Sequence, residues 1–525
     1  MEPSCIRQDL IPGTTKLFAD FLYHFERVSD FYGHSYSDPQ SFRDAAEQIH
    51  YPDERRARLI EALREQNGNS ASLDELARPG TLAVVTGQQV GLLSGPSYTI
   101  YKALTAVRLV HELRAGGLRA VPVFWLASED HDLAEVDHAW LFDQNARPTK
   151  ISVTNTVANG GPVGEVAIPE LPWAEIAQAL GDLPFASEVL DRLRTAYTPG
   201  GTFTCGFKRF LQDTLKDFGL LFLDPLAPAI RSLAAPFLSS TVERVPELLE
   251  ALRKRDAELA DRGYHAQVHL DQNSSLLFLL SDGKRIALRS KDGRFSARDK
   301  EYSVQELVSA GDHLSPNALL RPVMQDYLLP TISYIGGPSE IAYMAQAQVL
   351  YKSLLGRMPV MFPRNSFTLL DIRAEKLMAR YRLCLPDLFT HPDKVRCAIA
   401  AQLVPAGLAG EFSVLESSLT KSLESLRHNL HSFDPTLEAA AQKSSAKMLY
   451  QLKRLASKTA RETLRRDERS VWAANYLVDL VYPQKHLQER FYSVVPFLAK
   501  YGLDLPKQLF ERTQLTCPDH MIRTI

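Results

Sequence analysis

The stretch TLAVVTGQQVGLLSGPSYTIYKALTAVRLVHELRAGGLRAVPVFWLA, residues 81–127, decides the fold class. It predicts a strand at 81–87, a glycine-rich loop, a helix that stops at Gly116 and Gly117, and a second strand at 121–127. Both strands are continuous apolar runs, which is typical of parallel sheets that helices cover on both faces. A strand, a helix and a strand in this order predict a right-handed crossover unit.

The same pattern recurs further along the chain. GLLFLDP (219–225), PTISYIGGP (330–338) and RMPVMFPR (357–364) predict more strands, and a helix is expected from Ser339 to about Leu355. We therefore predict an α/β fold with a doubly wound parallel sheet and inserted connecting segments. Within one insertion, SDGK between two apolar runs predicts a hairpin, and residues 143–170 suggest further small hairpins.

A different periodicity begins near Glu411. Apolar residues are spaced there by three and four: Phe412, Leu415, Leu419, Leu423, Leu426, Leu430, Phe433 and Leu437. Asp434 and Pro435 would break this helix, and a second run follows through Met448, Leu452 and Leu455. Two long helices folded back as an antiparallel coiled coil fit best. We predict a homodimer through this coiled coil, with packing inside one chain as the alternative.

Length and charge limit the classes of function. A chain of 525 residues exceeds the roughly 250–300 residues of one core, so two or three domains are expected. The net charge of −2 gives no long-range attraction to nucleic acid or to an anionic membrane, and we predict neither partner. The expected parts are an N-terminal helical segment at 1–80, a core at 81–370 with insertions near 143–215 and 226–312, the coiled-coil domain at 371–480, and a segment returning to the core at 481–525.

Cysteine usage and hydropathy address the compartment. The five cysteines, at positions 5, 205, 384, 397 and 517, show no disulfide framework and no zinc spacing. This pattern fits a reducing compartment. The N-terminus lacks the pattern of a signal peptide, and no apolar run approaches the ~18 residues of a membrane span. We therefore predict a cytoplasmic protein without a membrane association.

The first candidate site is the glycine-rich loop between the first strand and its helix. Amides at Gly91 and Gly95, together with the helix N-terminus, could bind an anion. The spacing matches neither GxxxxGK[ST] nor GxGxxG. Lys102, on the following helix, either neutralises phosphate charge or lies in solvent. The plain alternative for the glycines is a tight turn.

The second candidate site is Ser128-Glu129-Asp130-His131-Asp132, directly after the strand at 121–127. Open α/β sheets place their ligands at the carboxyl ends of strands. Carboxylates around one imidazole can tune its pKa and orient it. We favour an acid/base or substrate-binding role over a metal site, because the cluster holds a single His. In the alternative, an aspartate caps the next helix and His131 is packed.

Two further candidate sites lie near the last strands. Arg321, beside Pro322 and close to Asn317, offers a planar cation for a carboxylate or phosphate, or else an ion pair with Asp326. Gly336, Gly337 and Glu340 repeat the strand, glycine and helix arrangement of the first loop. The glutamate would bind an amine or a ribose hydroxyl, or simply favour the first turn of its helix.

Several long segments together resemble one family. TGQQVGLLSGPSYTIYKALTA, VPVFWLASEDHD, LSPNALLRPVMQDYLLPTISYIGGPSEIAYMAQ and KHLQER are similar to stretches of the cysteine-adding enzymes of bacillithiol synthesis, the BshC family. The resemblance runs from about residue 10 to the C-terminus. It implies a Rossmann-like core with two inserted connecting segments and a coiled-coil dimerisation domain. It also implies the last step of bacillithiol synthesis, in which a ligase joins cysteine to the amino group of glucosaminyl-malate.

The chemistry of such a ligase suggests roles for the candidate residues. Catalytic roles are assigned to Asp130, His131 and Asp132. Substrate binding is assigned to Gln88, Gln89, Glu129, Asn317, Arg321 and Glu340. ATP or another adenine nucleotide with Mg would activate the cysteine carboxylate, held by Gly91, Gly95, Lys102, Gly336 and Gly337. No tightly bound metal is predicted.

Two other functions stay open at this point. The sequence lacks the HxGH and KMSKS motifs of class I synthetases, which leaves another cysteine donor possible. A nucleotidyltransferase-like enzyme for another small carboxylate or sugar is one alternative, and a non-catalytic dimeric scaffold is the other. All site predictions share one spatial expectation, that Gly91, Asp130, Arg321 and Gly337 converge at one crevice on the rim of the sheet.

Overall fold

The computed structural model describes residues 4–153, 160–291, 294–298 and 300–525. The chain divides into two compact units. The first comprises Met1–Gln144, Pro148–Thr368 and Glu489–Ile522, and the second comprises Asn145–Arg147, Leu369–Gln488 and Arg523–Ile525. The chain thus returns to the first unit at Glu489, whereas the segment that returns to the core was expected to begin at residue 481.

The first unit is built on a five-stranded sheet with the strand order β13-β12-β2-β3-β6. Every neighbouring pair in it is parallel. The strands are β2 (Leu82–Gln89), β3 (Ala120–Ala127), β6 (Leu221–Leu223), β12 (Thr331–Gly336) and β13 (Val360–Pro363). The predicted doubly wound sheet is confirmed. The chain moves outward from β2 through β3 to β6, then crosses back to β12, so the winding reverses between β2 and β12.

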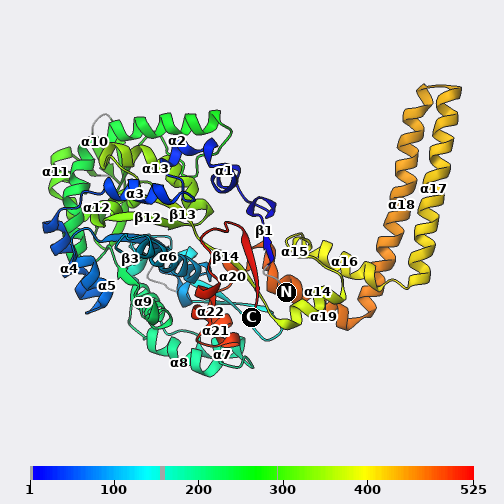
Figure 1. The fold of residues 1–525 in the computed structure, drawn as a ribbon, viewed down its shortest axis with the longest axis horizontal. Helices are drawn as coiled ribbons and strands as arrows, with labels where there is room; N and C mark the ends of the chain where they lie inside the picture. The colour runs from blue at the N-terminus through cyan, green and yellow to red at the C-terminus, as the bar shows by residue number, and fades with distance from the viewer. Residues whose placement is uncertain (1–3, 154–159, 292–293, 299) are drawn as a thin grey trace. The chain divides into compact units, whose positions relative to one another are not determined.

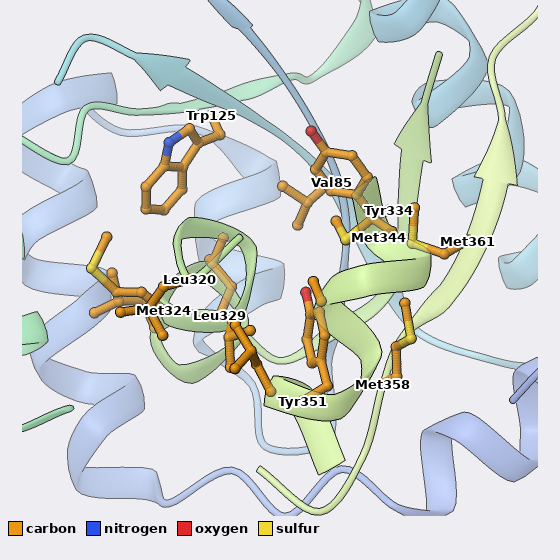
Figure 2. Packing of buried hydrophobic residues seen from close by; sticks show 14 of the residues in the cluster. Val85, Trp125, Leu320, Met324, Leu329, Tyr334, Met344, Tyr351, Met358 and Met361 are labelled. Atoms are coloured by element: carbon orange, nitrogen blue, oxygen red, sulfur yellow. The ribbon is translucent and has the colours of Figure 1, made fainter. Parts of the chain in front are cut away.

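Helices lie on both sides of the sheet (Figure 1). Helix α6 (Tyr98–Ala115) packs along β2 and β3, and most of its side chains are buried. Helix α13 (Pro338–Leu354), which connects β12 to β13, packs against α10 (Pro228–Asp261) and α12 (Arg321–Leu328). Side chains from these strands and helices form one apolar cluster, part of which is shown in Figure 2.

The N-terminal region is largely helical, as predicted. Its helices are α1 (Lys16–Tyr23), α2 (Ser29–Tyr32), α3 (Pro39–Glu47), α4 (Asp53–Asn67) and α5 (Ala71–Ala77). Helix α3 contacts β12 and β13, whereas α4 contacts β6. Ahead of them, the short strand β1 (Ser4–Ile6) pairs antiparallel with β15 (His520–Thr524). This small sheet has the order β1-β15-β14, where β14 is Ser366–Leu370.

The insertions carry antiparallel strands and short helices. Between β3 and β6 lie the hairpin β4 (His138–Phe142) and β5 (Pro148–Ser152), then α7 (Trp173–Leu180), α8 (Ala186–Ala196) and α9 (Phe203–Thr214). This hairpin confirms part of the prediction for 143–170, of which 154–159 lie outside the described residues. Between β6 and β12 lies a sheet of β7 (Ser274–Ser281), β8 (Lys284–Lys291), β9 (Arg294–Ala297), β10 (Lys300–Tyr302) and β11 (Leu314–Pro316).

The predicted SDGK hairpin is confirmed in this second insertion. Strands β7 and β8 pair antiparallel, and Ser281 lies opposite Lys284. Asp282 and Gly283 form the turn with φ values of 53° and 68°. A two-residue turn with positive φ at both positions matches the twist of the flanking strands, and Asp-Gly is a favoured sequence for it. The remaining helices of the unit are α11 (Val304–Ser309), α20 (Gln488–Phe491), α21 (Val495–Tyr501) and α22 (Leu505–Arg512).

The second unit is a helical domain whose two long helices form the predicted coiled coil. Helix α17 (Ala406–Phe433) and helix α18 (Thr436–Arg466) run side by side and are joined at Asp434 and Pro435 (Figure 1). The shorter helices are α14 (Ile372–Arg380), α15 (Leu385–Leu388), α16 (Pro392–Leu403) and α19 (Glu468–Val481). Among the described residues no single helix qualifies as a membrane span, although α16 and α17 together, bent by 106°, satisfy the criteria of length and composition.

Candidate active site

The carboxyl edge of the parallel sheet opens into a cavity of about 720 Å³. The winding of the sheet reverses between β2 and β12, and open α/β sheets bind ligands outside the strand ends at such a point. The cavity is therefore the candidate active site. Ten residues singled out from the sequence line it: Gln88, Gln89, Lys102, Glu129, Asp130, His131, Asn317, Arg321, Gly337 and Glu340.

Four of the predicted site residues are not part of this lining: Gly91, Gly95, Gly336 and Asp132. The amide of Gly91 donates to the carbonyl of Gln89, and the amide of Gly95 donates to Leu92. Both amides that were predicted to hold phosphate are thus hydrogen-bonded inside their own loop. The loop forms a tight turn, which was the alternative to an anion-binding site. The carboxylate of Asp132 accepts the N–H of Ala134 and caps the short helical turn Leu133–Glu135.

Asp130 and His131 belong to a hydrogen-bonded cluster after β3. Gln89 at the end of β2 donates its amide nitrogen to Asp130 at 2.6 Å and to Glu135 at 2.8 Å. Arg285, from the hairpin strand β8, places a guanidinium nitrogen 3.1 Å from Nδ1 of His131. Three segments that are distant in sequence therefore meet around this imidazole.

The partners of this cluster set its protonation. Burial alone would raise the pKa of Asp130, but hydrogen bonds from His131 and Gln89 lower it well below its usual range. Asp130 is therefore ionised at neutral pH. Nδ1 of His131 lies 3.1 Å from a guanidinium nitrogen of Arg285, which can only donate, and 3.5 Å from a carboxylate oxygen of Asp130.

Glu129 differs from its neighbour Asp130 in its surroundings. It is 5% exposed, and its carboxylate lies 3.3 Å from Nη1 of Arg231 on α10. Burial raises the pKa of Glu129, and the charges of Arg231 and Arg285 oppose this effect without cancelling it. Two adjacent carboxyl groups thus have pKa values displaced in opposite directions, an arrangement that allows different roles in one site.

Lys102 and Glu340 form a buried ion pair across the switch point, with Nζ and Oε2 2.6 Å apart. Lys102 also donates to the carbonyl of Gly87 at 2.8 Å and to Gln88 at 3.0 Å, which accounts for its three protons. Glu340 accepts the amide of Gly337 at 2.8 Å and closes the start of α13. Both residues predicted to meet ligand charges therefore neutralise each other.

Arg321 begins α12 and lies at the wall of the cavity. Its Nη2 donates to the hydroxyl of Tyr343 at 2.8 Å. Among the described residues it makes no ion pair with Asp326, whose carboxylate instead lies 2.7 Å from the hydroxyl of Tyr351. Asn317 accepts two amides at the start of the same helix and fixes its orientation. The structure therefore leaves the charge of Arg321 available to a ligand.

Two more arginines complete the cationic side of the cavity. Arg364, just after β13, forms an ion pair with Glu489 at 2.7 Å, and both side chains are almost fully buried. Arg490, which follows Glu489, lines the cavity. It forms no ion pair within the described part of the chain. Burial lowers the pKa of Arg490, and the charge of Arg364 adds to this effect. Tyr98 lies under Arg364, with the guanidinium 5.0 Å from the ring centre.

Comparison with known proteins places this site in a family. The model of the N-terminal Rossmann-like domain of bacillithiol biosynthesis BshC matches residues 1–365, and that of the C-terminal coiled-coil domain of BshC matches residues 367–525. The chain belongs to the BshC family. A relative named "Putative cysteine ligase BshC" from Solibacter usitatus is 46% identical over 525 residues, covering 100% of both chains. Relatives with the same name from Koribacter versatilis and Bacillus cytotoxicus are 38% and 28% identical, covering 99% and 87% of this chain and 99% and 88% of their own.

The sequence did not reveal every residue of this BshC-family cavity. Arg285, Arg364, Arg490 and Tyr98 line it as well, as do Tyr334 and Tyr343, which belong to the motif around Glu340 and were given no role. A signal existed for Arg490, because KHLQER was among the segments that carried the resemblance to BshC. None existed for Arg285, which is one of several charged residues in a hairpin and reaches the cavity only in the folded chain, where it contacts His131.

Proposed function

We propose that this chain is a ligase of bacillithiol biosynthesis that joins the carboxyl group of cysteine to the amino group of glucosaminyl-malate. The names of its relatives support the cysteine ligase activity. The choice of the second substrate, and the position of this reaction as the last step, rest on the resemblance and on the charges of the cavity.

The supporting observation concerns the lining arginines that have no ion pair among the described residues: Arg285, which lies near the charges of Glu129 and Asp130, and then Arg321 and Arg490. Lys102 is paired with Glu340, and Arg364 is paired with Glu489. Arg321 donates to a tyrosine hydroxyl, and Arg490 lines the same cavity.

Two such cations match the two carboxylates of a malate group. Arg321 was predicted to hold one of them. We propose that Arg490 holds the other, because guanidinium groups bind carboxylates through paired hydrogen bonds. A monocarboxylate would leave one arginine without a partner.

The opposite side of the cavity suits the forming amide bond. As the carbon–nitrogen bond forms, the carbon–oxygen bond to the activating group on the cysteine carboxyl carbon breaks, and that group leaves with the oxygen. The attacking amine loses a proton in the same step, and a carboxyl group with a raised pKa accepts it more readily than one with a lowered pKa. We assign this step to Glu129 in place of Asp130. His131 presents its Nε2–H to the oxygen of the reacting carboxyl carbon, because its other nitrogen faces Arg285. Asp130 and Glu135 hold the cysteine ammonium.

An adenine nucleotide with Mg was predicted to activate cysteine, and the residues chosen for its phosphates do not fit that role. The amides of Gly91, Gly95 and Gly337 and the ammonium of Lys102 all have partners within the protein. We therefore derive no step through a nucleotide.

We further propose that the functional form is a homodimer through the coiled coil. Helices α17 and α18 leave apolar side chains exposed, among them Val414, Leu415, Leu426, Met448 and Leu455. A second copy of these helices would bury them. Sedimentation of the full chain, compared with a variant in which Leu415 and Leu426 are replaced by Lys, tests this: the expected change is from dimer to monomer, and a monomeric parent protein would contradict it.

The proposed reaction is tested with the purified protein, cysteine and glucosaminyl-malate. The product is detected by mass spectrometry as bacillithiol, with other glucosaminyl acids and small carboxylates as a comparison panel. Cells that lack the protein should accumulate glucosaminyl-malate and contain no bacillithiol. Normal bacillithiol levels in those cells, together with no preference for glucosaminyl-malate in vitro, would reject the proposal and favour another substrate or a scaffold.

A further inference from the structure

Two of the five cysteines, one near each end of the chain, lie in contact. The sulfur atoms of Cys5 and Cys517 are 3.8 Å apart although 512 positions separate the residues. Cys5 is in β1, and Cys517 lies shortly ahead of β15, the strand with which β1 pairs, separated from its start by Pro518 and Asp519. Cys5 is exposed and Cys517 is partly buried. The contact thus brings an accessible thiol together with a sheltered one.

The surroundings hold this contact in place. The hydroxyl of Tyr23 donates to Asp519 at 2.6 Å and accepts the amide of Gln8 at 2.8 Å. These bonds tie the chain just after Cys5 to the chain just after Cys517. The paired strands and this bridge hold the two sulfur atoms 3.8 Å apart, within about 2 Å of the length of a disulfide bond.

We propose that Cys5 and Cys517 are a reversible thiol–disulfide modification site that reacts with low-molecular-weight disulfides. The exposed thiolate of Cys5 attacks one sulfur of the small disulfide, which forms a mixed disulfide and releases one small thiol. Cys517 then attacks the Cys5 sulfur and releases the second. Two protein thiols are oxidised to one disulfide, and one small disulfide is reduced to two small thiols, so that atoms and electrons balance.

The order of these steps follows from the burial of the two residues. Burial raises the pKa of Cys517, so less of it is thiolate at neutral pH. Cys5 is therefore the first to react. Once Cys5 carries the small thiol, Cys517 attacks as an intramolecular partner, whose effective concentration is in the millimolar range or above.

The other three cysteines lack this arrangement. Cys205, Cys384 and Cys397 are exposed, and within the described residues no second cysteine sulfur is found beside any of them. The thiol of Cys384 donates to Asp387 at 2.9 Å, and this bond raises its pKa. These residues should stop at mixed disulfides, and so they act as internal controls.

The disulfide would stiffen a segment that supports the candidate active site. Around Cys517, Gln514 exchanges two hydrogen bonds with Asn365, and His520 lies 2.6 Å from the hydroxyl of Ser366. Asn365 and Ser366 follow Arg364 of the cavity. The bond would therefore tie the N-terminal strand to the support of a cavity arginine. This inference does not depend on the proposed reaction.

The experiment uses the full-length protein and glutathione disulfide. After a short exposure, non-reducing digestion and mass spectrometry should show a peptide pair linked through Cys5 and Cys517, which dithiothreitol reverses. The triple variant C205S/C384S/C397S should form the same link. In C517S, Cys5 should instead accumulate a stable glutathione adduct, whose loss is at least about tenfold slower than in the parent.

A second readout is independent of these adducts. Amide hydrogen exchange in β1 and in residues 514–522 should slow on oxidation of the parent and stay unchanged in C5S. A stable glutathione adduct on Cys5 of the parent would overturn the proposal. So would a Cys5–Cys517 link found only after denaturation, or links formed mainly between two chains.

Discussion

Replacing Arg490 with glutamine should weaken binding of a dicarboxylate while leaving the fold intact. The change keeps most of the side-chain volume and removes one charge that has no ion-pair partner in the described part of the chain. A hydrogen bond to a charged group contributes about 2 kcal/mol, which corresponds to a ~30-fold rise in KM for glucosaminyl-malate. The kcat at saturating substrate should change much less, because Arg490 lies on the side of the cavity away from the proposed amide bond.

The same substitution should not lower the stability of the unliganded protein. Arg490 lies beside Arg364, and the repulsion between the two charges helps to lower the pKa of Arg490. Removing one of two like charges relieves this repulsion. We therefore expect the Tm without substrate to stay the same or rise, while the gain in Tm on adding glucosaminyl-malate becomes smaller.

Steady-state kinetics with two substrates separate this explanation from a general disturbance. A glucosaminyl acid with a single carboxylate should show a high KM with the parent and only a small further change with R490Q. R58Q, which removes a charge from an exposed position of α4, is the matched control and should leave both values unchanged. An equal loss for both substrates, or an unchanged KM for glucosaminyl-malate, would refute the assignment of Arg490 to a malate carboxylate.

Three other predictions concern stability. Burial lowers the pKa of His520 to about 4, so the parent should lose up to ~3 kcal/mol of stability as the pH falls from about 6.5 to 4, and H520Q should not. Urea unfolding across this range measures both proteins, and pH profiles that run parallel would contradict the reasoning. E340Q removes the partner of the buried Lys102 ammonium and should lower the free energy of unfolding, measured with urea, by ~3 kcal/mol. The double variant E340Q/K102M should recover most of this loss. Losses that add up in the double variant would contradict the ion pair. In G87A the new methyl carbon would lie 2.8 Å from a backbone carbonyl of β3, so a loss of about 2 kcal/mol is expected, whereas G410A on the open surface of α17 should not destabilise the protein, as thermal unfolding would show.

The sequence predicted the strands and long helices well because their patterns are local. The runs that became β2, β3 and β13 contain continuous apolar stretches, and β12 alternates Ile and Tyr with buried Thr331 and Ser333. A strand buried on both faces needs a mainly apolar run wherever it lies in the sheet. The break at Asp434 and Pro435 was equally visible, since proline cannot continue a helix. The short strand β1 carried no comparable pattern, because three residues are too few to show a period.

The candidate site was only partly predictable. Asp130, Arg321 and Gly337 were expected to meet, and all three line the cavity, because the carboxyl ends of parallel strands share one edge. Gly91 was expected to line the cavity with them, but its amide donates to a carbonyl of its own loop. The glycine pattern by itself cannot show whether a turn's amides face a ligand or their own carbonyls.

Local sequence alone thus determined which segments become strands and helices, and which polar residues follow the strands at the functional edge. Only the tertiary structure decided which of their charges remain available. Lys102 and Glu340 are 238 positions apart and neutralise each other, as do Arg364 and Glu489 over 125 positions. Charges act through space with a range of several ångströms, so the pairing that leaves Arg321 and Arg490 for a ligand exists only once the chain has folded.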